Sequence, residues 1–179
     1  AARDILEQIP LEDKISVDAL VLLANTYRHL GQYDDSIAMA SRALDEKPDY
    51  HYALYGMGKT LLVIGQYRDA SNFITKALSM GAPDVVQFDL GYAYYLSEDY
   101  QRASHHLTNI LSLLQDEPSQ LLLAQYLLYD MQAGEQPSIQ LIENNISYWQ
   151  NEAHKFNDSP YGMVLKAHID TLTTWLKER

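Results

Sequence analysis

The chain has 179 residues, of which 47% are apolar, and its 24 Asp and Glu against 13 Lys and Arg give a net charge of −11. This charge argues against a nucleic-acid-binding protein, because such binding depends largely on Lys and Arg neutralising phosphates. The chain has no cysteine, which excludes disulfides, thiol catalysis and cysteine-based zinc sites. No stretch approaches the roughly 18 apolar residues that a membrane span needs, so a cytoplasmic location is expected.

The start of the chain has a spacing of small, apolar and proline residues that recurs later. Ala2, Leu6 and Pro10 are spaced as Ala40, Leu44 and Pro48 are. Residues 1–10 are therefore predicted to form the second helix of a preceding repeat, whose first helix would lie upstream of Ala1. Ser16 is predicted to be the N-cap of the helix that follows.

The middle of the chain repeats with a period of 33 or 34 residues. Gly31-Gln32-Tyr33 matches Gly65-Gln66-Tyr67, Tyr67 matches Tyr100, and Gly58 matches Gly91. A fixed period in this range is typical of stacked helical pairs, each of which buries its apolar face only against its neighbours. Three repeats are predicted, at residues 16–48, 49–83 and 84–116.

Within these repeats, helices are predicted from Val17 to Leu30, Asp34 to Glu46, Tyr50 to Ile64, Arg68 to Met80, Asp84 to Leu96 and Asp99 to Leu114. Gly81 is predicted to be a left-handed helix cap. Small residues at equivalent positions, Ala24, Gly58 and Gly91, should let the paired helices approach closely. Tyr33, Tyr67 and Tyr100 should lie at the turn into each second helix, where the ring would seal the gap between the helices.

The pattern becomes looser after Leu114. Residues 118–157 are predicted to be a degenerate fourth helical hairpin, with one helix over 118–133 that ends at Gly134 and another that opens at Pro137. Residues 159–179 are predicted to be an amphipathic capping helix, with Ser159 as its N-cap and a proline in its first turn.

These residues resemble the tetratricopeptide repeat. The first unit has Leu20, Leu23, Ala24, Tyr27, Ala40 and Pro48, and the second has Leu54, Met57, Gly58, Ala70, Ile74 and Pro83. The resemblance covers roughly residues 17–114. It implies an all-α fold, a right-handed α-solenoid of helical hairpins with a C-terminal capping helix, which binds other proteins.

One octapeptide, Ala53 to Thr60, satisfies a permissive phosphate-loop pattern. A phosphate loop needs a strand before it and backbone amides that point at the phosphate, whereas this stretch lies inside a predicted helix. Nucleotide binding is therefore not expected. No histidine pair has metal-binding spacing and no catalytic motif is legible, so we expect neither an enzyme nor a cofactor.

The resemblance also implies a concave groove, lined by the exposed side of each first helix. Some members of the family hold a carboxylate there with a clamp of Lys, Asn and Arg, and only Asn25 of that clamp is present, with Val21, Gly56, Val85 and Asp89 at other clamp positions. The remaining candidates are mainly aromatic, which favours binding through apolar contact. The candidate peptide-binding residues are Val21, Asn25, Arg28, Tyr52, Tyr55, Lys59, Phe88, Tyr92 and Tyr95.

The leading interpretation is a protein–protein interaction module, a scaffold, adaptor or chaperone-like protein, that binds an apolar or aromatic peptide with at most one acidic group near Lys59. Its partner would be another protein and not a nucleic acid. The alternative is a structural or regulatory repeat segment of a larger multidomain protein or assembly factor, with its groove occupied in cis. Several of the candidate rings could instead pack against the neighbouring repeat.

Overall fold

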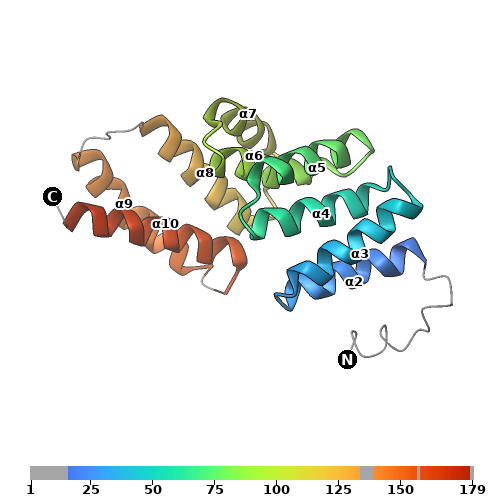
Figure 1. The fold of residues 1–179 in the computed structure, drawn as a ribbon. Helices are drawn as coiled ribbons and strands as arrows, with labels where there is room; N and C mark the ends of the chain where they lie inside the picture. The colour runs from blue at the N-terminus through green and yellow to red at the C-terminus, as the bar shows by residue number, and fades with distance from the viewer. Residues whose placement is uncertain (1–15, 134–138, 157, 178–179) are drawn as a thin grey trace. The chain divides into compact units, whose positions relative to one another are not determined.

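The computed structural model describes residues 16–133, 139–156 and 158–177, so the helix predicted over residues 1–10, Gly134 and Pro137 lie outside the described residues. All regular structure in this part of the chain is helical (Figure 1). The chain divides into two compact units, residues 1–99 and 100–179, and each is described by itself. Among the described residues, no helix is both long and apolar enough to cross a membrane.

The first unit is a series of antiparallel helical pairs. Its helices are α2 (Val17–His29), α3 (Tyr33–Glu46), α4 (His51–Val63), α5 (Tyr67–Ser79), the 3-10 helix η1 (Asp84–Val86) and α6 (Gln87–Leu96). Each α-helix packs against the next, and α2 also contacts α4 (Figure 1). Stacking of successive pairs makes this an all-α helical solenoid, as the repeat period predicts.

The second unit contains α7 (Tyr100–Ile110), α8 (Pro118–Ala133), α9 (Ile139–His154) and α10 (Pro160–Lys177). Helix α10 packs against both α8 and α9. Leu165 is fully buried and Ile169 is 2% exposed, so the apolar face of α10 lies inward as expected. His168 contacts the Tyr126 ring, and burial lowers the pKa of this histidine, although the Asp130 carboxylate acts in the opposite direction.

The helix ends follow from local chemistry. Ser16 Oγ accepts a hydrogen bond from Ala19 N at 3.2 Å, and Ser159 Oγ accepts one from Gly162 N at 2.9 Å, which confirms both predicted N-caps. Gly31, Gly65 and Gly81 have φ values of +74°, +83° and +92°, a region that costs glycine nothing sterically. The left-handed cap predicted at Gly81 is therefore confirmed.

The three repeating tyrosines begin the second helices α3, α5 and α7. Tyr67 packs against the buried cluster that contains Ala24, Met57 and Ala70, in agreement with a sealing role. Tyr100 is 50% exposed and begins the second unit, so the sealing role expected of its ring stays a prediction. The backbone position recurs because the turn recurs, whereas the burial of the ring depends on its neighbours.

The third predicted repeat departs most from the pattern. Its first helix starts as the 3-10 turn η1 before α6 begins, and α7 ends at Ile110 instead of Leu114. Glu98 takes the place of Gly31 and Gly65 in the turn and has a φ of +64°, which is strained for a residue with a Cβ. The division between the two units falls within this repeat, so the third hairpin stays a prediction.

Close contact between α4 and α5 depends on Gly58. A Cβ built on Gly58 would lie 2.6 Å from Ile74 Cγ1 and 3.2 Å from the Ala70 carbonyl oxygen. Ile74 is fully buried and has no room to move away. The predicted role of this small residue as a helix contact is thereby confirmed.

We expect Gly58→Ala to lower the free energy of unfolding by about 1–3 kcal/mol, because it overpacks a filled interface. Gly56 is the matched control on the same helix, since its Cβ would meet only Asn25 Oδ1, at 3.7 Å. Gly56→Ala should instead raise the free energy of unfolding by up to about 1 kcal/mol through helix propensity. Urea unfolding followed by circular dichroism separates the two, and a destabilising Gly56→Ala or a neutral Gly58→Ala would contradict this packing.

The octapeptide that resembles a phosphate loop lies inside α4, so Lys59 and Thr60 are helical as predicted. Thr60 is fully buried and its hydroxyl donates to the Gly56 carbonyl at 3.0 Å. The same hydroxyl lies 2.9 Å from Ser36 Oγ, which links α4 to α3. The polar groups of this stretch are therefore engaged in holding the repeats together.

Candidate functional site

The candidate site is a groove of about 450 Å³ in the first unit. It lies between α2, α4 and the segment that leads into α6. The residues that line it are Val21, Asn25, Arg28, His29, His51, Tyr52, Tyr55, Gly56, Lys59, Ala82, Pro83, Val85 and Val86. Most of this lining is apolar or aromatic, a composition common in sites that bind apolar side chains.

The helical period explains which predicted residues meet here. Val21 and Asn25 are four residues apart on α2, so they share the face that Arg28 extends. Tyr52, Tyr55 and Lys59 share a face of α4 in the same way, and all six of these residues line the groove. First helices of adjacent repeats are therefore neighbours along this surface, since α2 contacts α4.

The three candidates on α6 do not line the groove. Phe88 is only 1% exposed and stacks on Tyr92, with 6.4 Å between the ring centroids. Tyr92 packs against the core cluster that contains Ala93 and Leu61, and burial raises its pKa to about 12. Tyr95 is partly buried and is not among the lining residues.

Placing Phe88 on an exposed face was therefore wrong, whereas Tyr92 is partly buried. Spacing correctly puts the two rings on one side of α6, but spacing does not say whether that side is covered. In place of α6, the segment just before it borders the groove through Ala82, Pro83 and Val85. Val85 is 40% exposed, so this segment offers the groove an accessible apolar side chain.

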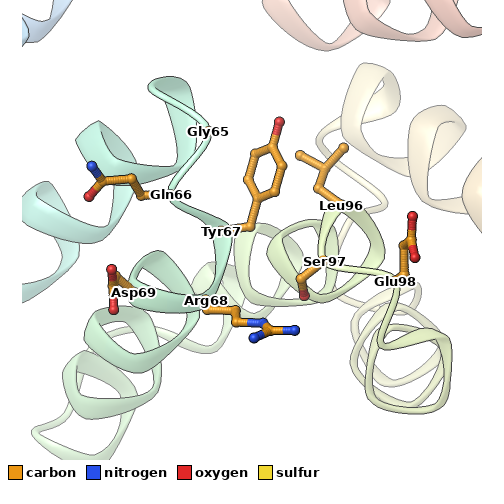
Figure 2. Close-up of a pocket in the computed structure, with 8 residues that line it drawn as sticks. All are labelled: Gly65, Gln66, Tyr67, Arg68, Asp69, Leu96, Ser97 and Glu98. Atoms are coloured by element: carbon orange, nitrogen blue, oxygen red, sulfur yellow. The ribbon is translucent and has the colours of Figure 1, made fainter.

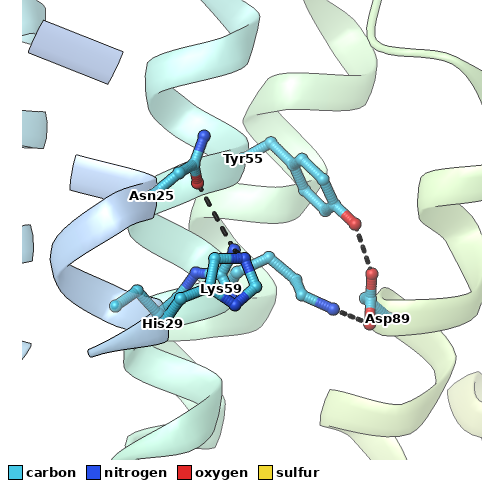
Figure 3. Close-up of polar contacts among 6 residues, drawn as sticks. Asn25, His29, Tyr55, Lys59 and Asp89 are labelled. Carbon is cyan, nitrogen blue, oxygen red and sulfur yellow. Dashed lines mark hydrogen bonds and ion pairs between the residues drawn. The ribbon is translucent and has the colours of Figure 1, made fainter. Parts of the chain in front are cut away.

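Lys59 is already paired within the chain. Its Nζ lies 2.7 Å from Asp89 Oδ1, and the Tyr55 hydroxyl donates to Asp89 Oδ2 at 2.5 Å. Figure 3 shows both side chains of α4 directed at Asp89 on α6. Asp89 is 3% exposed, so this carboxylate joins the two helices and balances the charge that Lys59 was expected to offer a ligand.

Sequence reasoning did not predict this ion pair, although a signal was present. Tyr55 and Asp89 are 34 residues apart, one more than the 33 residues that separate Gly58 from Gly91. Asp89 therefore follows directly after the position equivalent to Tyr55, and residues near equivalent positions come close on neighbouring first helices. The same reasoning missed His29, which follows Asn25 by four residues on the α2 face, and His51, whose ring lies 4.1 Å from that of Tyr52.

Arg28 is the other cation of the groove. Its Nη2 donates to Asn25 Oδ1 at 3.4 Å and lies 3.4 Å from His29 Nε2, so both contacts are long. Its Nε is buried without a hydrogen-bond acceptor. The ion pairs of Lys59, Lys76 and Lys155 do not involve Arg28.

A second hollow, of about 370 Å³, lies at the turns after α4 and α6. It is lined by residues 65–69 and 96–98, and Figure 2 shows Tyr67 and Leu96 next to each other at its edge. Its charged residues are of both signs, with Arg68 and Asp69 at the start of α5 and Glu98 in the turn after α6. It offers less apolar surface than the groove between α2 and α4, and its mixed charges favour no one class of ligand.

Among the described residues, no group of three or more His, Asp or Glu could hold a metal ion.

Comparison with known protein families gives a match over part of the chain. The family model for the tetratricopeptide repeat matches residues 29–85, which contain α3, α4, α5 and the segment that borders the groove. Residues 29–85 are therefore tetratricopeptide repeat. Among curated protein sequences, no match was found.

Solved structures agree with the fold of a tetratricopeptide-repeat protein. The MamA RS-1 ArsTM double mutant has a TM-score of 0.64 and 18% identity, with 94% of this chain and 85% of that chain covered. YrrB, a tetratricopeptide-repeat protein with an unusual peptide-binding site, has a TM-score of 0.59 and 16% identity over 96% of this chain and 92% of its own.

A third structure is a Thermobaculum terrenum O-GlcNAc transferase mutant, with a TM-score of 0.56 and 23% identity. The match covers 60% of this chain but only 22% of that protein. At these identities the three likenesses show the fold and not the activity.

Proposed function

We propose that this tetratricopeptide-repeat chain is a protein–protein interaction module, which holds an extended segment of another protein in the groove between α2 and α4. What supports the proposal most is the gathering of Val21, Tyr52, Tyr55 and Val85 around one groove of about 450 Å³. Large apolar side chains that stay accessible on a rigid surface are typical of binding hot spots.

The stiffness of the groove also favours binding. Two of its walls are the helices α2 and α4, and the Lys59–Asp89 ion pair ties α4 to α6. Tyrosine rings have few rotatable bonds, so little side-chain entropy is lost when a ligand covers them. A peptide would therefore meet a surface that needs little ordering.

The experiment selects ligands from a random dodecamer library displayed on phage, and then measures the affinity of an enriched synthetic peptide by fluorescence anisotropy. We expect enriched peptides to be rich in apolar and aromatic residues. Tyr52→Ala should weaken binding by about 30-fold, since truncation of a hot-spot residue costs about 2 kcal/mol. Its melting temperature should hardly change, because Tyr52 is 52% exposed.

Tyr148 provides a matched control away from the groove. It is a helical tyrosine with 53% exposure, and it contacts a neighbouring Trp149 ring much as Tyr52 contacts Tyr50. Tyr148→Ala should leave the affinity unchanged. Equal weakening by both substitutions, or none by Tyr52→Ala, would contradict binding in this groove.

A further inference from the structure

The described residues that line the groove carry charge of one sign. In a chain with 24 Asp and Glu against 13 Lys and Arg, none of these described lining residues is acidic. Its ionic lining residues are Arg28 and Lys59. The groove suits apolar side chains, and its charged lining residues are cations although the chain as a whole has an excess of acidic residues.

Only one of these two cations has its charge balanced by the protein. Lys59 lies 2.7 Å from the buried carboxylate of Asp89. Arg28 has two contacts of 3.4 Å to neutral groups, and its buried Nε has no acceptor. A guanidinium has five N–H donors and is best satisfied by the two oxygens of one carboxylate.

Acidic residues close to the groove do not fill this role. Asp18 accepts a hydrogen bond from the Tyr50 hydroxyl, and Asp84 is exposed and lies 3.4 Å from Gln87 Nε2. Asp84 adjoins Pro83 and Val85, so a ligand carboxylate would be repelled at that side and attracted at the α2 side. Charge therefore distinguishes the side of the groove next to Asp84 from the side formed by α2.

We propose, on the basis of the proposed function, that the partner segment carries an Asp or Glu side chain that pairs with Arg28. Apolar or aromatic residues beside this acid would cover Tyr52 and Val85. The acid-binding position is thus on α2 and not at Lys59. A carboxylate can accept two parallel hydrogen bonds from the guanidinium, which adds orientation as well as affinity. Arg28 then acts as a specificity-determining residue of the groove.

The test uses the phage-displayed dodecamer library, in which the C-terminus of each peptide is fused and any carboxylate is a side chain. We expect Asp or Glu to be enriched at one position next to aromatic residues. In a synthetic, amidated copy of an enriched peptide, replacing this Glu with Gln should weaken binding at least about tenfold. Against the Arg28→Gln chain, the Glu and Gln peptides should bind equally.

Arg42→Gln is the matched control, since Arg42 is a partly buried arginine on α3 and is not among the groove residues. It should retain the full discrimination between the two peptides. Arg28→Lys, which keeps the charge but loses the planar fork, should retain part of it. This second variant keeps the test valid even where Arg28→Gln fails to fold, as judged by circular dichroism.

The other outcomes separate this inference from the proposed function. If the selected peptides contain no Asp or Glu and their binding still depends on Tyr52, the inference of an acidic partner segment is overturned and the groove remains the binding site. If the preference for the Glu peptide over the Gln peptide is lost in Lys59→Met but kept in Arg28→Gln, Arg28 is not the residue that pairs with the acid. An amidated peptide that binds only when its terminal carboxylate is restored would show a chain end as the ligand, and insensitivity to both Tyr52 and Arg28 would contradict both proposals.

Discussion

Lys59→Met is expected to lower the free energy of unfolding by about 3 kcal/mol, because it leaves the Asp89 carboxylate buried without its cation. The Asp89 side chain is 4% exposed and too short to reach water, whereas the Lys59 side chain is 18% exposed and flexible. Asp89→Asn should therefore cost less, since Lys59 can turn towards solvent and the amide oxygen still accepts a hydrogen bond. The measurement is urea unfolding of both variants.

The double variant Lys59→Met with Asp89→Asn tests whether the two residues act as a pair. It should be more stable than Lys59→Met alone, because no unpaired charge remains, and the coupling should be about 1–3 kcal/mol. Lys76 gives a matched control, as it pairs with Asp49 at 3.7 Å with both side chains exposed. Lys76→Met should cost less than about 1 kcal/mol. Additive effects at Lys59 and Asp89 would contradict a coupled pair.

Leu165→Ala is expected to lower the free energy of unfolding by about 3 kcal/mol, since it removes a fully buried side chain and leaves a cavity. Leu165 lies on α10, which packs against α8 and α9, and the substitution tests how firmly this last helix is held. Met163 on the same helix is 56% exposed and serves as the control. Met163→Ala should change stability by no more than about 0.5 kcal/mol.

Calorimetric melting of the two α10 variants beside the parent chain gives the comparison. A melting temperature that is much lower for Leu165→Ala than for Met163→Ala would support the proposal that residues 159–179 cover the preceding helices as a cap. If Leu165→Ala melts within a degree or two of Met163→Ala, α10 contributes little to the folded state and the capping role is contradicted.

Features set by nearby residues could be predicted from the sequence. Ser16 and Ser159 cap their helices because a side-chain oxygen three residues before an amide reaches it in any helix start. Gly31 and Gly65 adopt positive φ because the turn requires it. The helical pairs and their period follow from spacing along the chain, and the six groove residues on α2 and α4 are those that the resemblance to the tetratricopeptide repeat implies.

Features that depend on distant residues could not be predicted in this way. The spacing of Phe88 and Tyr92 correctly predicted a shared face, but only the folded chain shows that Phe88 is buried and Tyr92 partly buried. The clamp pattern showed only that Asp89 stands at a position where the clamp residue is absent. The structure shows that Asp89 is the partner of Lys59 and Tyr55.

The physical reason is the range of the interactions. Helix capping, turn geometry and the 3.6-residue period act over a few residues, so the sequence alone determined that this chain is a stack of helical pairs. Burial and ion pairing depend on which side chains meet across separate helices. Only the tertiary structure therefore decided that the groove is bordered by α2, α4 and the segment before α6, with the charge of Lys59 balanced and that of Arg28 not.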